Sequence, residues 1–147
     1  MDYMLQAFIC ANRAASHDDV PIGGVIVMNG KIIARGRNQV QLKQNPTLHA
    51  EIDAINKATK KLGQKFLTDC EIYVTLEPCA MCAVAISYAR IKKIYFAATD
   101  EKGGAILHNA EIFKTDKHLF KPEIIHVPEY AEKSAQLLKK FFKSKRN

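Results

Sequence analysis

EIYVTLEPCAMCAVAISYA, residues 71–89, is the stretch that decides the fold of this chain. Residues 71–76 form a short apolar, β-branched run, which predicts a buried strand. Pro78 suits the first turn of a helix, where its missing N–H costs nothing, so a helix over 78–89 is expected directly after the strand. A second apolar run, IKKIYFAA at 91–98, predicts the next strand. This strand, helix, strand order predicts parallel strands joined by a right-handed crossover.

A β-hairpin is predicted upstream, in IGGVIVMNGKIIARGRN. Two β-branched runs, 22–28 and 31–37, are separated by Asn29 and Gly30. This residue pair readily takes the positive φ values of a type I′ turn, which joins two antiparallel strands.

Three further helices are expected. Apolar side chains recur on one helical face over residues 2–16, and AEKSAQLLKKFF predicts a closing helix. A helix beginning close to His49 should end at Gly63, and we expect it to bury its apolar face, namely Ile52, Ile55 and Ala58.

The alternation of strands and helices predicts a three-layer α/β/α fold around a central mixed sheet of about five strands. A length of 147 residues with 48% hydrophobic residues suits one domain, residues 1–147. The segment 99–123 gives no clear pattern, although Gly103 and Gly104 indicate a loop.

Charge and apolar content narrow the possible partners. The formal net charge is +7, and KKFFKSKRN at 139–147 carries five cations and no acid. This favours a polyanionic partner such as nucleic acid, although a solvated lysine-rich tail fits equally well. The longest apolar run, CAMCAVAI, is too short to span a bilayer, and no signal peptide is recognisable, so we expect a cytoplasmic protein without a membrane partner.

His49, Cys79 and Cys82 form a candidate metal site. Two cysteines three residues apart at a helix start project to the same side, where the helix dipole favours thiolates. Zinc suits this donor set, with one ion per chain, and three protein ligands leave the fourth position open for water, as in catalytic sites. A closed structural site would need a fourth ligand, for which the candidates are His17, His108, His118 and His126.

Glu51 makes this metal-binding site a candidate catalytic site. It follows His49 by two residues, close enough to reach a zinc-bound water and to move its proton. Because two thiolates neutralise the charge of zinc and weaken it as a Lewis acid, water activation must depend on such a carboxylate. The alternative is an ordinary solvated glutamate on a helix.

HAE at 49–51 and PCAMC at 78–82 match the H-x-E and P-C-x-x-C signature of nucleobase deaminases. The chain resembles the cytidine deaminase superfamily, and within it the bacterial tRNA-specific adenosine deaminases. Further matching stretches are DVPIGGVIV at 19–27, GRN at 36–38, NPTLHAEI at 45–52, YVTLEPCAMCAVAI at 73–86 and the final FFKSKR.

The resemblance implies a role for each matching residue. His49, Cys79 and Cys82 would bind zinc, and Glu51 would be the catalytic proton shuttle. Three positions would contact the substrate: Asn38 would hydrogen-bond the target base, Asp100 would meet the nucleotide backbone, and Phe142 in the closing helix would approach the anticodon nucleotides. The resemblance also implies a homodimer.

The implied reaction is the hydrolytic deamination of adenosine to inosine at the wobble position, within a tRNA anticodon stem-loop. Zinc-bound hydroxide would attack the ring carbon bearing the amine while Glu51 transfers protons. One departure lies after DEKGGA, where the family usually continues with Gly-Ser and this chain has ILHNAEIF. Two alternatives remain: a deaminase of a free base or nucleoside, and a non-catalytic zinc module that binds nucleic acid.

Overall fold

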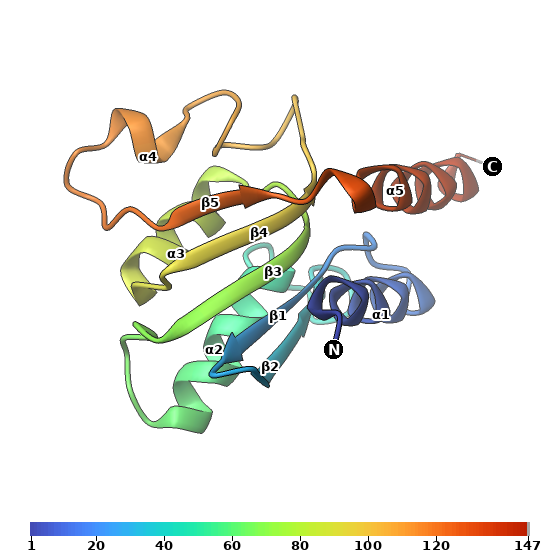
Figure 1. Ribbon diagram of the computed structural model, residues 1–147. Coiled ribbons are helices and arrows are strands. Elements are labelled where there is room, and N and C mark those ends of the chain that lie inside the picture. The colour runs from blue at the N-terminus through green and yellow to red at the C-terminus, as the bar shows by residue number, and fades with distance from the viewer. Residues whose placement is uncertain (147) are drawn as a thin grey trace.

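The computed structural model describes residues 1–146, in which one mixed sheet has the strand order β2-β1-β3-β4-β5 (Figure 1). β1 is antiparallel to both of its neighbours, whereas β3, β4 and β5 run parallel. The strands are β1 (Gly23–Met28), β2 (Lys31–Arg37), β3 (Cys70–Leu76), β4 (Lys93–Ala98) and β5 (Glu123–His126). The predicted sheet of about five strands is therefore confirmed.

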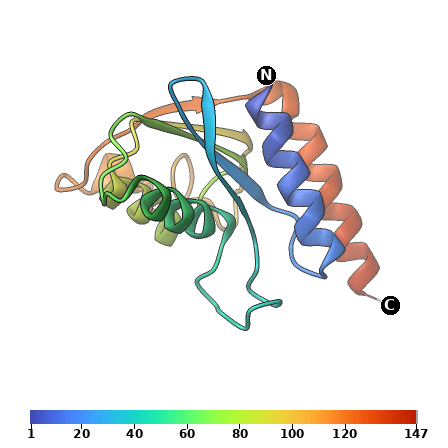
Figure 2. The ribbon, with the colours of Figure 1, turned by 90° about the horizontal axis from the view of Figure 1, so that it is seen from below.

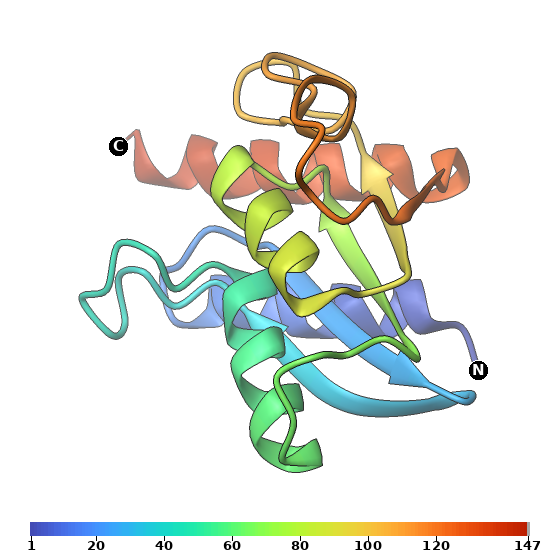
Figure 3. The same ribbon diagram turned by 90° about the vertical axis from the view of Figure 1, so that its left-hand side faces the viewer.

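Helices cover both faces of the sheet, which confirms the three-layer fold (Figure 2). α1 (Tyr3–Ser16) and α5 (Ala131–Lys145) lie side by side on one face, while α2 (Ala50–Leu62) and α3 (Ala80–Ala89) cover the other (Figure 3). The short helices α4 (Ile112–Thr115) and η1 (Pro128–Tyr130) flank β5. None of the helices in residues 1–146 is long and apolar enough to cross a membrane. That residues 1–147 form one domain stays a prediction.

Two glycines of the hairpin strands allow the helices on both faces to pack closely against the sheet. Asn29 and Gly30 have φ values of 50° and 76°, as the predicted type I′ turn requires. A Cβ atom on Gly23 would lie 2.1 Å from the carbonyl oxygen of Ala7 in α1, and one on Gly36 would lie 2.2 Å from that of Ala50 in α2. Only glycine permits these approaches, and the second holds the start of α2 against β2.

Two sequence predictions about the helices were wrong in detail. α3 begins at Ala80 rather than Pro78, because Cys79 keeps extended backbone angles and serves as the N-cap. In α2 the buried residues include Ala50, Ala54 and Ala58, while Ile52 and Ile55 are only half-buried. The small alanines allow α2 to approach Gly36 closely, which turns the isoleucines toward the margin of the core.

Candidate metal and active site

The three predicted metal ligands meet where two helices begin. His49 is the N-cap of α2, Cys79 is the N-cap of α3, and Cys82 lies in the first turn of α3. Nδ1 of His49 lies 3.6 Å from the Sγ atoms of both Cys79 and Cys82. Helix starts carry unpaired N–H groups and a partial positive charge, so both thiols lie where thiolates are favoured.

The spacing of these donor atoms fits one metal ion. The three ligand atoms all lie within 4.8 Å of one another. Nitrogen and sulfur atoms that bind a tetrahedral zinc at about 2.1 and 2.3 Å lie roughly 3.6 Å apart. The group formed by His49, Cys79 and Cys82 could therefore hold such an ion with little rearrangement.

The protonation of the two cysteines also favours a cation between them. Hydrogen bonds from the Cys82 thiol and from His49 lower the pKa of Cys79 to about 4. The pKa of Cys82 is raised, first because its proton is shared with Cys79 and second because the side chain is buried. Two adjacent thiolates repel each other unless a cation lies between them, so full deprotonation requires a metal.

Glu51 lies in the first turn of α2 and is 4% exposed. Burial, with a smaller contribution from the charge of Cys79, raises its pKa to about 7. A carboxyl group with this pKa exchanges protons readily near neutral pH, which suits a general acid and base. The alternative reading of Glu51 as a solvated helix residue was wrong.

No fourth ligand joins the group within residues 1–146, where its members are His49, Cys79 and Cys82 alone. The imidazoles proposed as alternatives are engaged elsewhere or exposed. His17 bonds the Arg13 carbonyl, His108 bonds Glu77, His126 bonds the Ala97 carbonyl, and His118 is exposed. The arrangement therefore corresponds to an open site rather than a closed structural one.

The three predicted substrate contacts occupy different environments. Asn38 is buried at the end of β2, and its Oδ1 accepts the N–H of Val40 at 3.0 Å, which fixes the side chain in a turn. Asp100 follows β4, where its Oδ1 accepts two backbone N–H groups of its own loop. Phe142 is 47% exposed on α5, in edge contact with Phe141. Their contacts with a substrate stay predictions.

The sequence interpretation missed Glu77, which precedes the metal helix and whose side chain is 0% exposed. Its carboxylate accepts the N–H groups of Asp100, Ile106 and Leu107 at 3.0, 3.1 and 2.9 Å, and Nδ1 of His108 lies 2.8 Å away. These bonds hold the loop after β4 next to the metal ligands. A glutamate between a buried strand and Pro-Cys was a signal for this role.

Asp19 was also missed, although it is 1% exposed. Its two carboxylate oxygens accept the N–H groups of Gln41 and Leu42, at 2.7 and 3.0 Å. These residues lie in the loop that joins Asn38 to His49. Asp19 therefore fixes the second loop beside the site.

Comparison with known proteins identifies relatives of this chain. The family model described as MafB19-like deaminase matches residues 1–146. The tRNA-specific adenosine deaminase of Rickettsia bellii is 44% identical over 146 residues, which cover 98% of this chain and 100% of that protein. The protein of the same name from Agrobacterium fabrum is 41% identical, with 98% and 94% covered.

Solved structures of deaminases share the fold. One, from a study of A-to-I editing by tRNA:A34 deaminases at the wobble position of transfer RNA, superposes with a TM-score of 0.89 at 40% identity and covers 92% of this chain and 98% of that chain. The guanine deaminase of Bacillus subtilis superposes with a TM-score of 0.67 at 33% identity, with 95% of each chain covered.

Proposed function

Because the chain belongs to the MafB19-like deaminase family, we propose that it is a tRNA-specific adenosine deaminase, which hydrolyses adenosine to inosine at the wobble position. One observation carries the chemistry: an open group of three metal donors adjoins the buried carboxylate of Glu51. The choice of substrate rests on the relatives named for it, which align over nearly the whole chain.

One zinc ion per chain would be held by His49, Cys79 and Cys82, the donor set that suits it. When bound, zinc supplies the Lewis acid that makes water a nucleophile near neutral pH. Glu51 would take one proton from the attacking water and deliver it to the ring nitrogen beside the reacting carbon. It would then take the second proton from the newly added hydroxyl group and pass it to the amine, which leaves as ammonia. Its burial keeps these transfers away from bulk water.

The remaining roles concern the position of the nucleotide. Asn38 would hydrogen-bond the target base, Asp100 would face the nucleotide backbone, and Phe142 would contact the anticodon nucleotides. An anticodon loop presents unpaired bases that can be turned into a pocket at small cost. Four of the five lysines of α5, from Lys139 to Lys145, would bind its phosphates and make binding salt-dependent.

A deaminase of a free base is the second candidate, favoured by the likeness to a guanine deaminase at 33% identity. Such an enzyme has no need of a basic closing helix. Its product would be ammonia released from a small molecule, with no inosine in RNA.

A homodimer acting in the cytoplasm completes the proposal. The outer face of α3 carries Tyr88, 71% exposed, and Phe120, 41% exposed, lies beside it in a shallow cleft that also includes Phe66. Exposed aromatic residues of this kind mark protein interfaces. We expect light scattering to give the mass of two chains, and Tyr88→Glu to give the mass of one.

The decisive experiment incubates the zinc-loaded protein with anticodon stem-loops that carry adenosine at the wobble position. Free adenine, guanine, cytosine and their nucleosides are tested in parallel, and inosine and ammonia are measured. Inosine in RNA that disappears with Glu51→Ala supports the proposal. Ammonia from a small molecule alone would establish the second candidate, and no product at all would favour a non-catalytic zinc module.

A further inference from the structure

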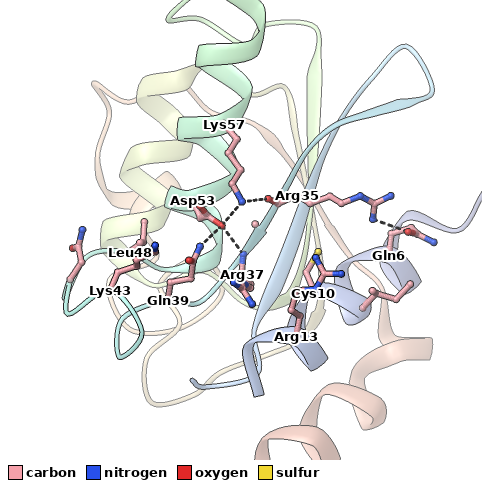
Figure 4. Close-up of a pocket in the computed structure, with 13 residues that line it drawn as sticks. Gln6, Cys10, Arg13, Arg35, Arg37, Gln39, Lys43, Leu48, Asp53 and Lys57 are labelled. Carbon is pink, nitrogen blue, oxygen red and sulfur yellow. Dashed lines mark hydrogen bonds and ion pairs between the residues drawn. The ribbon is translucent and has the colours of Figure 1, made fainter. Parts of the chain in front are cut away.

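A cleft of about 900 Å³ lies between α1, β2, α2 and the 38–48 loop (Figure 4). Five cationic side chains line this basic cleft and come from all four elements. They are Arg13 of α1, Arg35 and Arg37 of β2, Lys43 of the loop and Lys57 of α2.

Positive charge in the basic cleft is largely uncompensated. The acid that lines it, Asp53, accepts Nζ of Lys57 at 3.1 Å, Nε2 of Gln39 at 2.9 Å and the N–H of Arg37 at 3.1 Å. The side chains of Arg13, Arg35, Arg37 and Lys43 have no carboxylate within 4.0 Å in the part of the chain that the structure describes. Such a concave cationic surface attracts a polyanion.

The basic cleft and the metal site lie on opposite sides of the point where the two ends of the 38–48 loop come together. Gln39 and Leu48 line the cleft, their backbones are joined by a hydrogen bond of 3.0 Å, and the residues next to them are Asn38 and His49. On α2, residues two positions apart point in nearly opposite directions, so Asp53 faces the cleft while Glu51 faces the metal ligands. The distance from one to the other is thus about the width of a helix.

We propose that the basic cleft binds the phosphate backbone of the RNA strand that continues from the nucleotide held at the metal site. This proposal rests on the proposed function and extends it from the target base to the adjoining strand. Guanidinium groups match phosphate with two parallel hydrogen bonds, and three of the five cations are arginines.

The composition of the basic cleft indicates backbone rather than base recognition. None of its 13 lining residues, all within residues 1–146, is aromatic, so bases find no side chain on which to stack. Cations on several elements can follow a strand and hold its register without reading its sequence. The base-specific contacts are then left to the metal site.

The test compares Arg13→Gln/Arg37→Gln with a matched pair outside the cleft, Lys60→Gln/Lys121→Gln, in the full zinc-loaded chain. Both pairs remove two exposed or half-exposed cations, and melting temperatures verify folding. Anisotropy of a fluorescent anticodon stem-loop gives Kd at several salt concentrations. We expect the Arg13→Gln/Arg37→Gln variant to raise Kd by roughly tenfold or more. The slope of log K against log salt should become less steep by about 2. The control pair should change neither quantity as much.

A second measurement locates the contact directly. Phenylglyoxal modifies exposed arginines, and mass spectrometry reports each site with and without the stem-loop. Protection of Arg13, Arg35 and Arg37 by the stem-loop, with the reactivity of Arg90 the same with and without RNA, supports the proposal. Protection that depends on protein concentration and needs no RNA would instead show a second copy of the chain in the cleft, and would overturn it.

The outcomes also separate this proposal from the proposed function. If the wild type makes inosine in RNA but the Arg13→Gln/Arg37→Gln variant retains its Kd and salt slope, the cleft proposal fails and the activity stands. If no inosine forms but the cleft pair weakens RNA binding and the control pair does not, the cleft is supported and the assigned reaction fails.

Discussion

Nδ1 of His108 lies 2.8 Å from Oε1 of Glu77, and this carboxylate also accepts the backbone N–H groups of Asp100, Ile106 and Leu107. One buried group thus connects the entry of the metal helix to a loop that is 23 to 31 residues away in sequence. The position of this loop and that of the metal ligands are coupled through it.

Glu77→Gln should therefore be strongly destabilising, although the side chain keeps its size. The amide replaces one acceptor with a donor, which opposes the backbone N–H groups, and we expect a loss of about 2–4 kcal/mol in the free energy of unfolding. Urea denaturation measures this loss. Glu71→Gln, on a partly exposed glutamate of β3, is the control and should cost well under half as much. Equal costs would contradict the assigned role of Glu77.

The Glu77–His108 pair should give a pH-dependent stability. The hydrogen bond to Glu77 raises the pKa of His108, so its contribution is present below the unfolded value of 6.5 and is lost as pH rises through the folded value. Burial opposes ionisation of Glu77, but its hydrogen bonds outweigh this and lower its pKa, so that contribution is lost in acid.

His108→Ala should consequently cost more stability near pH 5.5 than near pH 8.5. Unfolding curves at the two pH values measure the difference. His118→Ala, at an exposed histidine, is the control for the loss of an imidazole. A cost for His108→Ala that does not change with pH would mean that the imidazole is not charged in this contact.

Gly104 is required where the loop wraps around Glu77. A Cβ atom there would lie 2.4 Å from Cδ of Glu77 and 2.6 Å from the carbonyl oxygen of Asp100. Gly104→Ala should displace the loop and lower kcat/KM for the RNA substrate by at least tenfold, roughly. In Gly103→Ala the atom nearest to the new Cβ is a side-chain oxygen of Asp100 at 3.1 Å. Because this side chain can shift, we expect a much smaller loss of kcat/KM. Similar losses in both variants would argue against this steric reason.

Glu51 should destabilise the metal-free protein as pH rises. Its pKa changes from an unfolded value of 4.5 to about 7 in the folded chain, so the folded state binds the extra proton and stability falls between these values. Metal-free Glu51→Gln should match the wild type near pH 4 and exceed it by up to about 3 kcal/mol near pH 8. Thermal unfolding of the apoproteins tests this.

With zinc bound, the same Glu51→Gln variant should lose turnover by roughly 10²–10⁴ and keep the metal.

The sequence predicted those parts of the molecule that depend on local chemistry. Asn29-Gly30 determines a turn, Gly63 ends α2 with a φ of 64°, and the metal donors lie at helix starts because their motif spacing requires it. The helix boundary at Pro78 was misplaced by two residues, since proline is also compatible with the residue just before an N-cap.

The long-range contacts could not be predicted. The partners of Glu77 lie in a segment without periodicity, and the hydrogen bonds that fix it depend on how the chain returns after β4. The basic cleft likewise combines five cations from residues 13 to 57, each of which alone resembles an ordinary surface cation. No spacing rule brings them together, because the hairpin and α1 meet through tertiary packing, at Gly23 and between Cys10 and the two buried valines of β1.

Metal binding should stabilise the fold through the junction of α2 and α3, which it joins. Cys82→Ser should abolish stoichiometric zinc, whereas Cys70→Ala, at a buried cysteine of β3, should retain one zinc per chain. Atomic absorption measures the metal, and melting with and without a chelator measures its linkage to stability. The chelator should lower the melting temperature of the wild type and of Cys70→Ala but leave that of Cys82→Ser unchanged. The two donors that remain in Cys82→Ser cannot hold zinc as tightly as three. If this variant keeps one zinc and the chelator still lowers its melting temperature, the ion is bound elsewhere.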